Sequence, residues 1–163
     1  CKEDDTNLLI DIGASSINVS VYNEGKIDFT RMIKSGGDNI DFELSKRLSM
    51  STQSAEEIKI EQGDLYDVSE TDLVNNGILD IVNEWISEIE RIMQFYRNKN
   101  SRKKIDNIYI YGGGSNIKGL EAVMSQKFGI NTMKINELSN IEISDKDEPI
   151  EEYLNAIGSI IRY

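Results

Sequence analysis

The clearest structural signature in this sequence lies at residues 109–120, which read Tyr-Ile-Tyr-Gly-Gly-Gly-Ser-Asn-Ile-Lys-Gly-Leu. The apolar run Ile105–Tyr111 predicts a buried strand, and Ile117–Phe128 predicts a helix that follows it closely. Glycine has no Cβ atom, so the glycines between the two elements let the backbone approach a flat or anionic ligand. The start of the helix would add unpaired N–H groups and a positive dipole end. This stretch therefore predicts one side of a nucleotide site.

The glycine run does not fit either of two familiar nucleotide motifs. A dinucleotide fingerprint would need its third glycine at Ile117, and a P-loop would need a lysine at Leu120. A tight strand-to-helix turn with no ligand would need only one glycine. Three in succession favour close approach of a ligand over a purely structural turn.

The composition excludes several classes of function. The chain has 163 residues, enough for one domain with a sizeable core. Its 18 basic and 29 acidic residues give a net charge of −11, which argues against nucleic-acid binding. With one cysteine and no histidine, it cannot form an internal disulfide, a Cys/His zinc site or a histidine-based catalytic triad. No apolar run is long enough to span a bilayer. Carboxylates, backbone amides and a hard cation such as Mg²⁺ would have to carry any chemistry.

The periodicity predicts an α/β fold with one mixed five-stranded sheet. Three antiparallel strands come first and two strands follow helical segments; these are Asn7–Ile12, Ser16–Tyr22, Ile27–Lys34, Ile105–Tyr111 and Thr132–Ile135. Helices are expected at Asp38–Leu48, Ser54–Gln62, Asn76–Asn98 and Ile117–Phe128, and from Asp147 and Pro149 onward. Asp38 is the expected N-cap of the first helix, and Ser54 with Glu57 has capping-box spacing.

Right-handed crossovers then give the strand order 3-2-1-4-5, with helices on both faces. We expect a core of residues 7–48 and 76–163 and a small inserted subdomain of residues 49–75. Ligands in such sheets bind beyond the carboxyl ends of the strands. The ends of the first and fourth strands, at Gly13 and Gly112, would be neighbours there.

A second motif, residues 11–16 (Asp-Ile-Gly-Ala-Ser-Ser), forms the turn between the first two strands. A carboxylate such as Asp11 is costly at the end of a buried strand unless it is paired or near a metal. The amides and hydroxyls of Gly13–Ser16 could surround a phosphate. An ordinary Asp/Gly hairpin explains the pattern equally well. A third motif places Glu56 and Lys59 three residues apart on one helix face, which alone indicates no more than a surface ion pair.

Together these motifs resemble the second half of actin-like ATPases. The hairpin of residues 11–16, the helix start Gly36-Gly37-Asp38, the helix with Glu56 and Lys59 and the glycine run occur in the same order. Over nearly its whole length the chain is most similar to the PilM family of type IV pilus assembly proteins, although FtsA and MreB share the glycine motifs. The helix with Phe95-Tyr96-Arg97 and the run of residues 112–120 favour PilM, and residues 156–162 also match it. The chain departs from the family at Asn136, which is followed by Glu137 instead of proline.

The resemblance implies that ATP and Mg²⁺ lie in a cleft between two halves. It implies that the hairpin binds phosphates and holds Mg²⁺ through water at Asp11, that the glycine run lines adenosine, and that the Glu56–Lys59 helix reaches the sugar or base. The expected cofactor-binding residues are Asp11, Gly13, Ala14, Ser15, Ser16, Gly36, Gly37, Glu56, Lys59, Gly112, Gly113, Gly114 and Ser115.

The resemblance also implies a biological role. Such a protein would be an ATP-binding scaffold, cytoplasmic and peripheral to the inner membrane, that docks a PilN-like membrane protein through its full-length form. We expect this chain to be the second lobe, without the first. No residue is a candidate to orient an attacking water, so we expect weak ATP binding and no hydrolysis. The alternatives are an FtsA- or MreB-like filament protein that self-associates, a sugar or acetate kinase, and an interaction lobe that never meets nucleotide.

Overall fold

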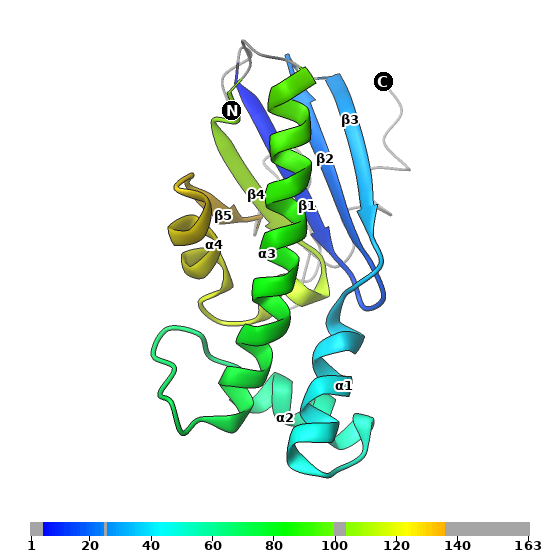
Figure 1. The fold of residues 1–163 in the computed structure, drawn as a ribbon, viewed down its shortest axis with the longest axis vertical. Helices are drawn as coiled ribbons and strands as arrows, with labels where there is room; N and C mark the ends of the chain where they lie inside the picture. The colour runs from blue at the N-terminus through cyan, green and yellow to red at the C-terminus, as the bar shows by residue number, and fades with distance from the viewer. Residues whose placement is uncertain (1–4, 25, 100–103, 136–163) are drawn as a thin grey trace, which may run out of the picture.

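The computed structural model describes residues 5–24, 26–99 and 104–135 of the chain. Strands and helices follow one another along the sequence as shown in Figure 1. In order they are β1 (Thr6–Ile12), β2 (Ile17–Asn23), β3 (Lys26–Ile33), α1 (Gly37–Leu48), α2 (Thr52–Gln62), α3 (Leu73–Lys99), β4 (Asn107–Tyr111), the 3₁₀ helix η1 (Gly113–Asn116), α4 (Leu120–Phe128) and β5 (Thr132–Lys134).

The strands form one mixed sheet in the order β3-β2-β1-β4-β5, which confirms the predicted order. β1 pairs with β2 and β2 with β3 in antiparallel fashion, whereas β1 with β4 and β4 with β5 are parallel. Asp11 and Tyr111 are partners in the parallel register. The carboxyl ends of β1 and β4 therefore lie side by side, as the sequence predicts.

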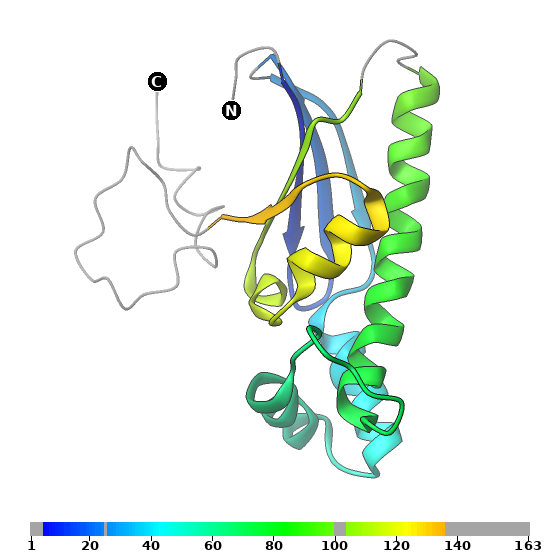
Figure 2. The same cartoon turned by 90° about the vertical axis from the view of Figure 1, so that its left-hand side faces the viewer.

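The core lies between one face of the sheet and α3. Alternate residues of the central strands are fully buried on this face, because side chains of a strand alternate between its two sides; they are Leu8, Ile10, Ile12, Ile17, Val19, Val21, Ile108 and Ile110. Trp85 and Ile89 of α3 are equally buried. α3 runs along this face of the sheet, and α4 contacts α3 (Figures 1 and 2). The helix predicted from Asp147 and Pro149 lies outside the described residues.

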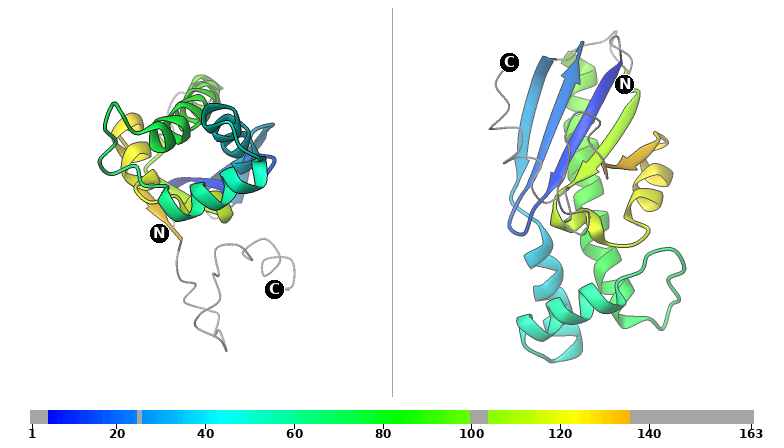
Figure 3. Two further views of the ribbon diagram at one scale, coloured as in Figure 1. Left: turned by 90° about the horizontal axis from the view of Figure 1, so that it is seen from below. Right: turned by 180° about the vertical axis from the view of Figure 1, so that it is seen from behind.

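α1, α2 and the first turns of α3 project beyond one end of the sheet (Figures 1 and 3). Two glycines allow these helices to pack closely. A Cβ atom on Gly77 would lie 2.8 Å from Leu44 Cδ2 of α1, and one on Gly63 would lie 3.3 Å from Ile78 Cδ1 of α3. These contacts join α1 to α3 and the C-terminal end of α2 to α3.

The N-terminus of α1 differs from the sequence prediction. The N-cap is Gly36, and Asp38 lies within the first turn. The Gly36 N–H donates to Asn39 Oδ1 at 3.0 Å. The prediction of Asp38 as N-cap was wrong because the chain already turns into the helix where Gly36 packs on the β1–β2 hairpin.

Three other helices also start at residues that differ from the prediction. α2 begins at Thr52, because the Ser51 hydroxyl accepts the Ser54 N–H at 3.1 Å, so Ser54 is not the cap. α3 begins at Leu73, earlier than predicted. α4 begins only at Leu120, after the turn of η1, because Gly119 adopts a left-handed conformation with φ +79°. No helix in the described ranges has both the length and the apolar character to cross a bilayer.

Candidate functional site

A cavity of about 350 Å³ opens where the carboxyl ends of β1 and β4 meet the helical insertion. Seven of the predicted site residues line it, namely Gly13, Ala14, Gly37, Glu56, Lys59, Gly113 and Gly114. The wall also contains residues that the sequence analysis did not select, namely Asp38, Asp41, Ile60, Gly63, Asn116, Ile117 and Lys118. The fold therefore brings the three separate motifs together around one space.

The β1–β2 hairpin is fixed to the start of α1 by backbone contacts. The Gly37 N–H donates to the Gly13 carbonyl at 3.1 Å, and the Asp38 N–H donates to the Ala14 carbonyl at 2.8 Å. A Cβ atom on Gly36 would lie 2.4 Å from the Gly13 oxygen, far inside a normal contact. Gly36 thus allows the helix to dock on the hairpin and lies outside the cavity wall, whereas Gly37 lies in it.

The consecutive glycines have three different environments. Gly112 has φ +85°, and a Cβ atom there would lie 2.7 Å from both Asp11 Oδ1 and the Ile12 carbonyl. A Cβ atom on Gly114 would lie 2.3 Å from Ile12 Cγ2. A Cβ atom on Gly113 would meet nothing within 4 Å. The fold itself requires Gly112 and Gly114, whereas Gly113 only keeps the cavity open.

The remaining predicted residues lie outside the cavity wall. Ser115 is buried and donates its hydroxyl to the Gly112 carbonyl at 2.7 Å, which closes the η1 turn. Ser15 lies at the exposed tip of the hairpin, followed by the half-buried Ser16. Both could reach a phosphate only if it extended beyond the cavity along the hairpin.

Asp11 is the last residue but one of β1, beside Gly112, and also lies outside the wall. Asn18 Nδ2 donates to Asp11 Oδ2 at 3.5 Å. Burial raises the pKa of the neighbouring Tyr111 to about 12, and the negative charge of Asp11 adds to that shift. Within the described ranges, no three acidic or cysteine side chains cluster to hold a metal directly. Asp11 is therefore compatible with a cation held through water and not with a preformed protein cage.

The cavity wall contains a buried ion pair that the sequence analysis missed. Lys59 Nζ of α2 lies 2.7 Å from Asp41 Oδ1 of α1 and donates a hydrogen bond to Oδ2 at 3.0 Å. Their side chains are only 14% and 10% exposed. Asp41 Oδ1 makes no hydrogen bond within the described structure. Lys59 thus pairs with Asp41 and not with Glu56, whose side chain is exposed at the cavity.

Burial raises the pKa of Asp41, and the Lys59 ammonium opposes that shift. A carboxylate in this position is stable only beside a cation. The sequence did contain a signal for the pair, because Asp41 lies on the same face of α1 as the buried Ile40 and Leu44. A charged residue at such a position requires a partner.

The arrangement suits a flat, polar ligand. Gly113 and Gly114 offer backbone without side chains on one wall, and α2 presents Glu56, Lys59 and Ile60 on the other. A carboxylate accepts hydrogen bonds from hydroxyl or amino groups, and the volume lies within the range of small-molecule sites. No side chain in the wall is a histidine, cysteine or serine nucleophile.

Comparison with known proteins agrees with this fold. The family described as "Type IV pilus assembly protein PilM" matches residues 2–161. The chain is 27% identical to the cell division protein FtsA of Buchnera aphidicola over 186 aligned positions, covering 96% of this chain and 44% of that protein. It is 40% identical to FtsA of Bacillus subtilis over 68 positions, covering 40% of this chain and 16% of that one.

Solved structures are similar in fold. A chain of a PilM–PilN type IV pilus biogenesis complex superposes with a TM-score of 0.79 at 22% identity, covering 96% of this chain and 45% of that chain. MreB of Spiroplasma citri bound to AMPPNP gives a TM-score of 0.69 at 16% identity, with coverages of 96% and 54%. The chain thus spans less than half of the FtsA and PilM proteins that it matches. Because the family match extends over residues 2–161, the chain belongs to the PilM family of type IV pilus assembly proteins.

Proposed function

We propose that this chain is one lobe of an ATP-binding, actin-like scaffold protein of type IV pilus assembly. The observation that carries the proposal is the cavity that joins the hairpin, the glycine run and α2. Its wall combines exposed backbone with the carboxylates of Asp38 and Glu56, the ammonium of Lys118 and the Asp41–Lys59 ion pair, which suits a nucleoside better than an apolar ligand. The similarity to an MreB bound to an ATP analogue supports the same kind of ligand.

In this proposal the adenosine part of ATP lies between Gly113 and α2, where Glu56 accepts hydrogen bonds from ribose or base. The Gly13 N–H donates to the Ser16 carbonyl at 3.0 Å, so the hairpin would offer the backbone amides of residues 14–16 and two hydroxyls to the phosphates. Asp11 would hold Mg²⁺ through water, and Mg-ATP would bind reversibly. No residue in the cavity wall is placed as a general base, so binding and not hydrolysis is the function that these residues support.

The role in pilus assembly rests on the family and on the similarity to a PilM–PilN complex. We propose that the complete protein lies on the cytoplasmic side of the inner membrane, peripheral to it, and binds a PilN-like membrane protein. The chain spans 45% of the PilM chain in that complex, so the surface that binds the partner can include residues beyond this sequence.

Nuclear magnetic resonance with Mg-ATP tests the site even at weak affinity. We expect saturable shifts at Gly113, Gly114 and Lys59 at millimolar ATP. Glu56→Gln should weaken binding about fivefold, the loss of one charge-assisted hydrogen bond. Glu57→Gln is the matched control, because Glu57 is exposed on the same helix but lies outside the cavity wall. Equal effects of the two substitutions, or shifts confined to other residues, would contradict the proposal.

A second candidate is an FtsA- or MreB-like protein that forms filaments, which the similarity to FtsA over 96% of this chain supports. Sedimentation with and without Mg-ATP separates the two. Filaments that pellet only with nucleotide favour the second candidate, and a species that stays small at all concentrations favours the first.

A further inference from the structure

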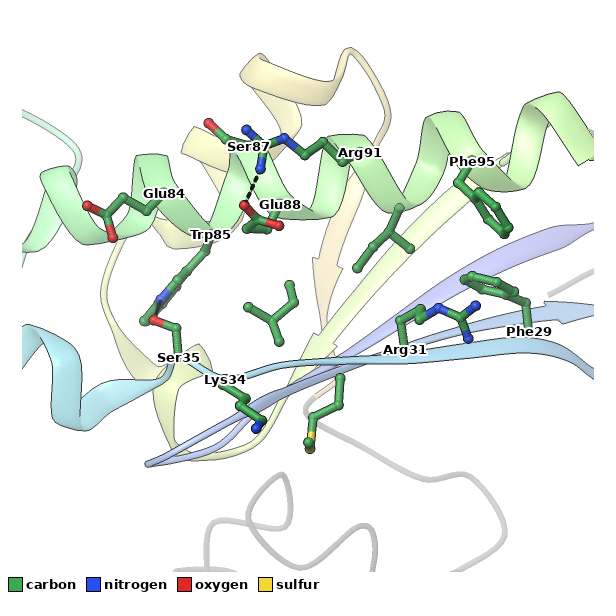
Figure 4. Close-up of a pocket in the computed structure, with 13 residues that line it drawn as sticks. Phe29, Arg31, Lys34, Ser35, Glu84, Trp85, Ser87, Glu88, Arg91 and Phe95 are labelled. Carbon is green, nitrogen blue, oxygen red and sulfur yellow. Dashed lines mark hydrogen bonds and ion pairs between the residues drawn. The ribbon is translucent and has the colours of Figure 1, made fainter.

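A second, larger hollow, which shares no lining residue with the nucleotide cavity, lies between β3 and α3. It is an open groove of about 750 Å³ lined by both elements (Figure 4). β3 is the last strand on this side of the described sheet, so its outer edge pairs with no described strand. Such an edge presents backbone N–H and C=O groups that can accept a further strand.

The register of β3 determines which of its side chains face the groove. Phe29, Arg31 and Ile33 are partners of Val21, Val19 and Ile17, which are fully buried beneath α3. The three residues therefore lie on the α3 side of β3. A strand added beside β3 would place every second side chain opposite them, because side chains alternate in a strand.

Both sides of the groove carry apolar side chains beside charged ones, which are Arg31, Lys34, Glu84, Glu88 and Arg91. The rings of Phe29 and Phe95 pack with centroids 5.6 Å apart, and Ile33 and Ile92 are partly buried next to the core. Phe95 is nevertheless 52% exposed. The core thus continues to the surface here, and apolar side chains of an added strand would cover what remains exposed.

The positive charge on the strand side comes from Arg31 and Lys34. The Arg31 guanidinium carbon lies 4.5 Å above the Phe29 ring and 5.8 Å from the Phe95 ring. On the helix side Arg91 is neutralised by its ion pair with Glu88 (Figure 4). Arg31 has no ion pair within the described residues. A positive side chain in this position, in a chain of net charge −11, favours an acidic residue directly opposite.

We propose that the β3 edge and the flank of α3 bind an extended acidic peptide of a partner protein as an added strand. The geometry assigns it the pattern apolar–any–acidic–any–apolar, with the acidic residue opposite Arg31 and the apolar residues opposite Phe29 and Ile33. Backbone hydrogen bonds along the edge would supply affinity, and the alternate side chains would supply specificity. The pattern reads the same in both directions, so it fits a parallel or an antiparallel peptide.

A second copy of this chain fits the edge less well. Symmetric antiparallel pairing of two β3 strands about Thr30 places Arg31 of each copy opposite Phe29 of the other, so no acidic residue faces Arg31. Two molecules of net charge −11 also repel each other.

The test uses the whole chain and two synthetic peptides with blocked ends, Thr-Ile-Thr-Glu-Thr-Ile-Thr and the same sequence with lysine in place of glutamate. Fluorescence anisotropy should show that the glutamate peptide binds about tenfold more tightly than the lysine peptide. Arg31→Glu should reverse this preference. Arg97→Glu, an exposed charge reversal on α3 outside the groove, should leave it unchanged. Proline at the central threonines should abolish binding, because it removes N–H donors.

Arg31→Glu must keep the circular dichroism and melting temperature of the wild type, and Arg31→Gln serves as a second variant with an intermediate effect. The proposal fails if neither peptide binds at millimolar concentration, or if Arg31→Glu and Arg97→Glu act alike. It also fails if the chain dimerises at micromolar concentration and Arg31→Glu abolishes the dimer, because the edge would then pair with a second copy. The residues are distinct from those of the ATP cavity, so a failure here leaves the proposed function untouched.

Discussion

Alanine substitutions at Gly112, Gly113 and Gly114, the consecutive glycines at the start of η1, should have three different effects on stability. At Gly112 the new side chain must adopt φ +85° and lies 2.7 Å from the Ile12 carbonyl. Together with ψ 166°, this is a backbone conformation that essentially only glycine adopts; it costs about 1–3 kcal/mol for a residue with a Cβ atom, and the backbone contact adds to that cost. Gly112→Ala should therefore lower the free energy of unfolding by about 3 kcal/mol.

At Gly114 an added side chain would clash with the core. The new Cβ atom would lie 2.3 Å from Ile12 Cγ2, and Ile12 is fully buried. Overpacking of this kind costs about 1–3 kcal/mol. At Gly113 there is neither a clash nor a positive φ. Gly113→Ala should raise the free energy of unfolding by about 0.5 kcal/mol, because the unfolded chain loses conformational freedom.

Urea and thermal unfolding can measure the series, since 1 kcal/mol corresponds to about 2–4 °C for a chain of this size. From most to least stable, the expected order is Gly113→Ala, wild type, Gly114→Ala and Gly112→Ala. The double variant Gly114→Ala/Ile12→Ala provides the control, because removal of Cγ2 should make its cost smaller than the sum of the two single costs. Gly113→Ala should also weaken ATP binding without loss of stability. A destabilised Gly113→Ala, or a neutral Gly114→Ala, would refute the packing argument.

Further predictions concern three side chains. Tyr96→Phe removes a hydrogen bond of 2.8 Å to Asp28 and should cost about 2 kcal/mol at neutral pH. Burial, and after it the hydrogen bond to Asp28, raises the pKa of Tyr96 to about 12. The stabilisation by the Tyr96 hydroxyl is therefore complete below pH 10 and is lost as the pH rises through 12. The melting temperatures of the variant and the wild type should converge over that interval. Lys59→Met leaves the Asp41 carboxylate without its cation and should lower the free energy of unfolding by about 3 kcal/mol. The double variant Lys59→Met/Asp41→Asn should recover most of this loss. Chemical denaturation of both variants measures the two effects. Arg47→Ala removes two partly exposed ion pairs, and the same assay should show a loss of no more than about 1 kcal/mol that shrinks in high salt.

The strand order and the meeting of the motifs could be predicted from the sequence because both depend on periodicity and topology. Alternating apolar residues in 16–22 and a continuous apolar run in 7–12 distinguish strands from helices. Parallel pairing of the first and fourth strands then necessarily brings Gly13 and Gly112 to the same edge. These inferences require no knowledge of side-chain contacts, and the sheet confirms them.

Helix starts were harder to predict, because several residues near each start can act as caps. Asp38 and Ser54 are good capping residues by type, yet Gly36 and Ser51 occupy those positions. At α1 the choice depends on a tertiary contact, the docking of Gly37 on the Gly13 carbonyl. The N-cap preference of a residue type is worth only about 1 kcal/mol, so it does not override such a tertiary contact.

The ion pair between α1 and α2 shows why the cavity wall could be predicted only in part. The spacing of Glu56 and Lys59 places both on one face of α2, but the partner of Lys59 depends on how α2 packs against α1. That packing places the Asp41 carboxylate beside Lys59 at 2.7 Å, whereas Glu56 remains exposed. The same pair joins α2 to α1, the helix that docks on the β1–β2 hairpin. A change in the position of α2 must therefore alter the cavity and the stability of the pair together, and ATP affinity should depend on Asp41 although Asp41 belongs to none of the recognisable motifs.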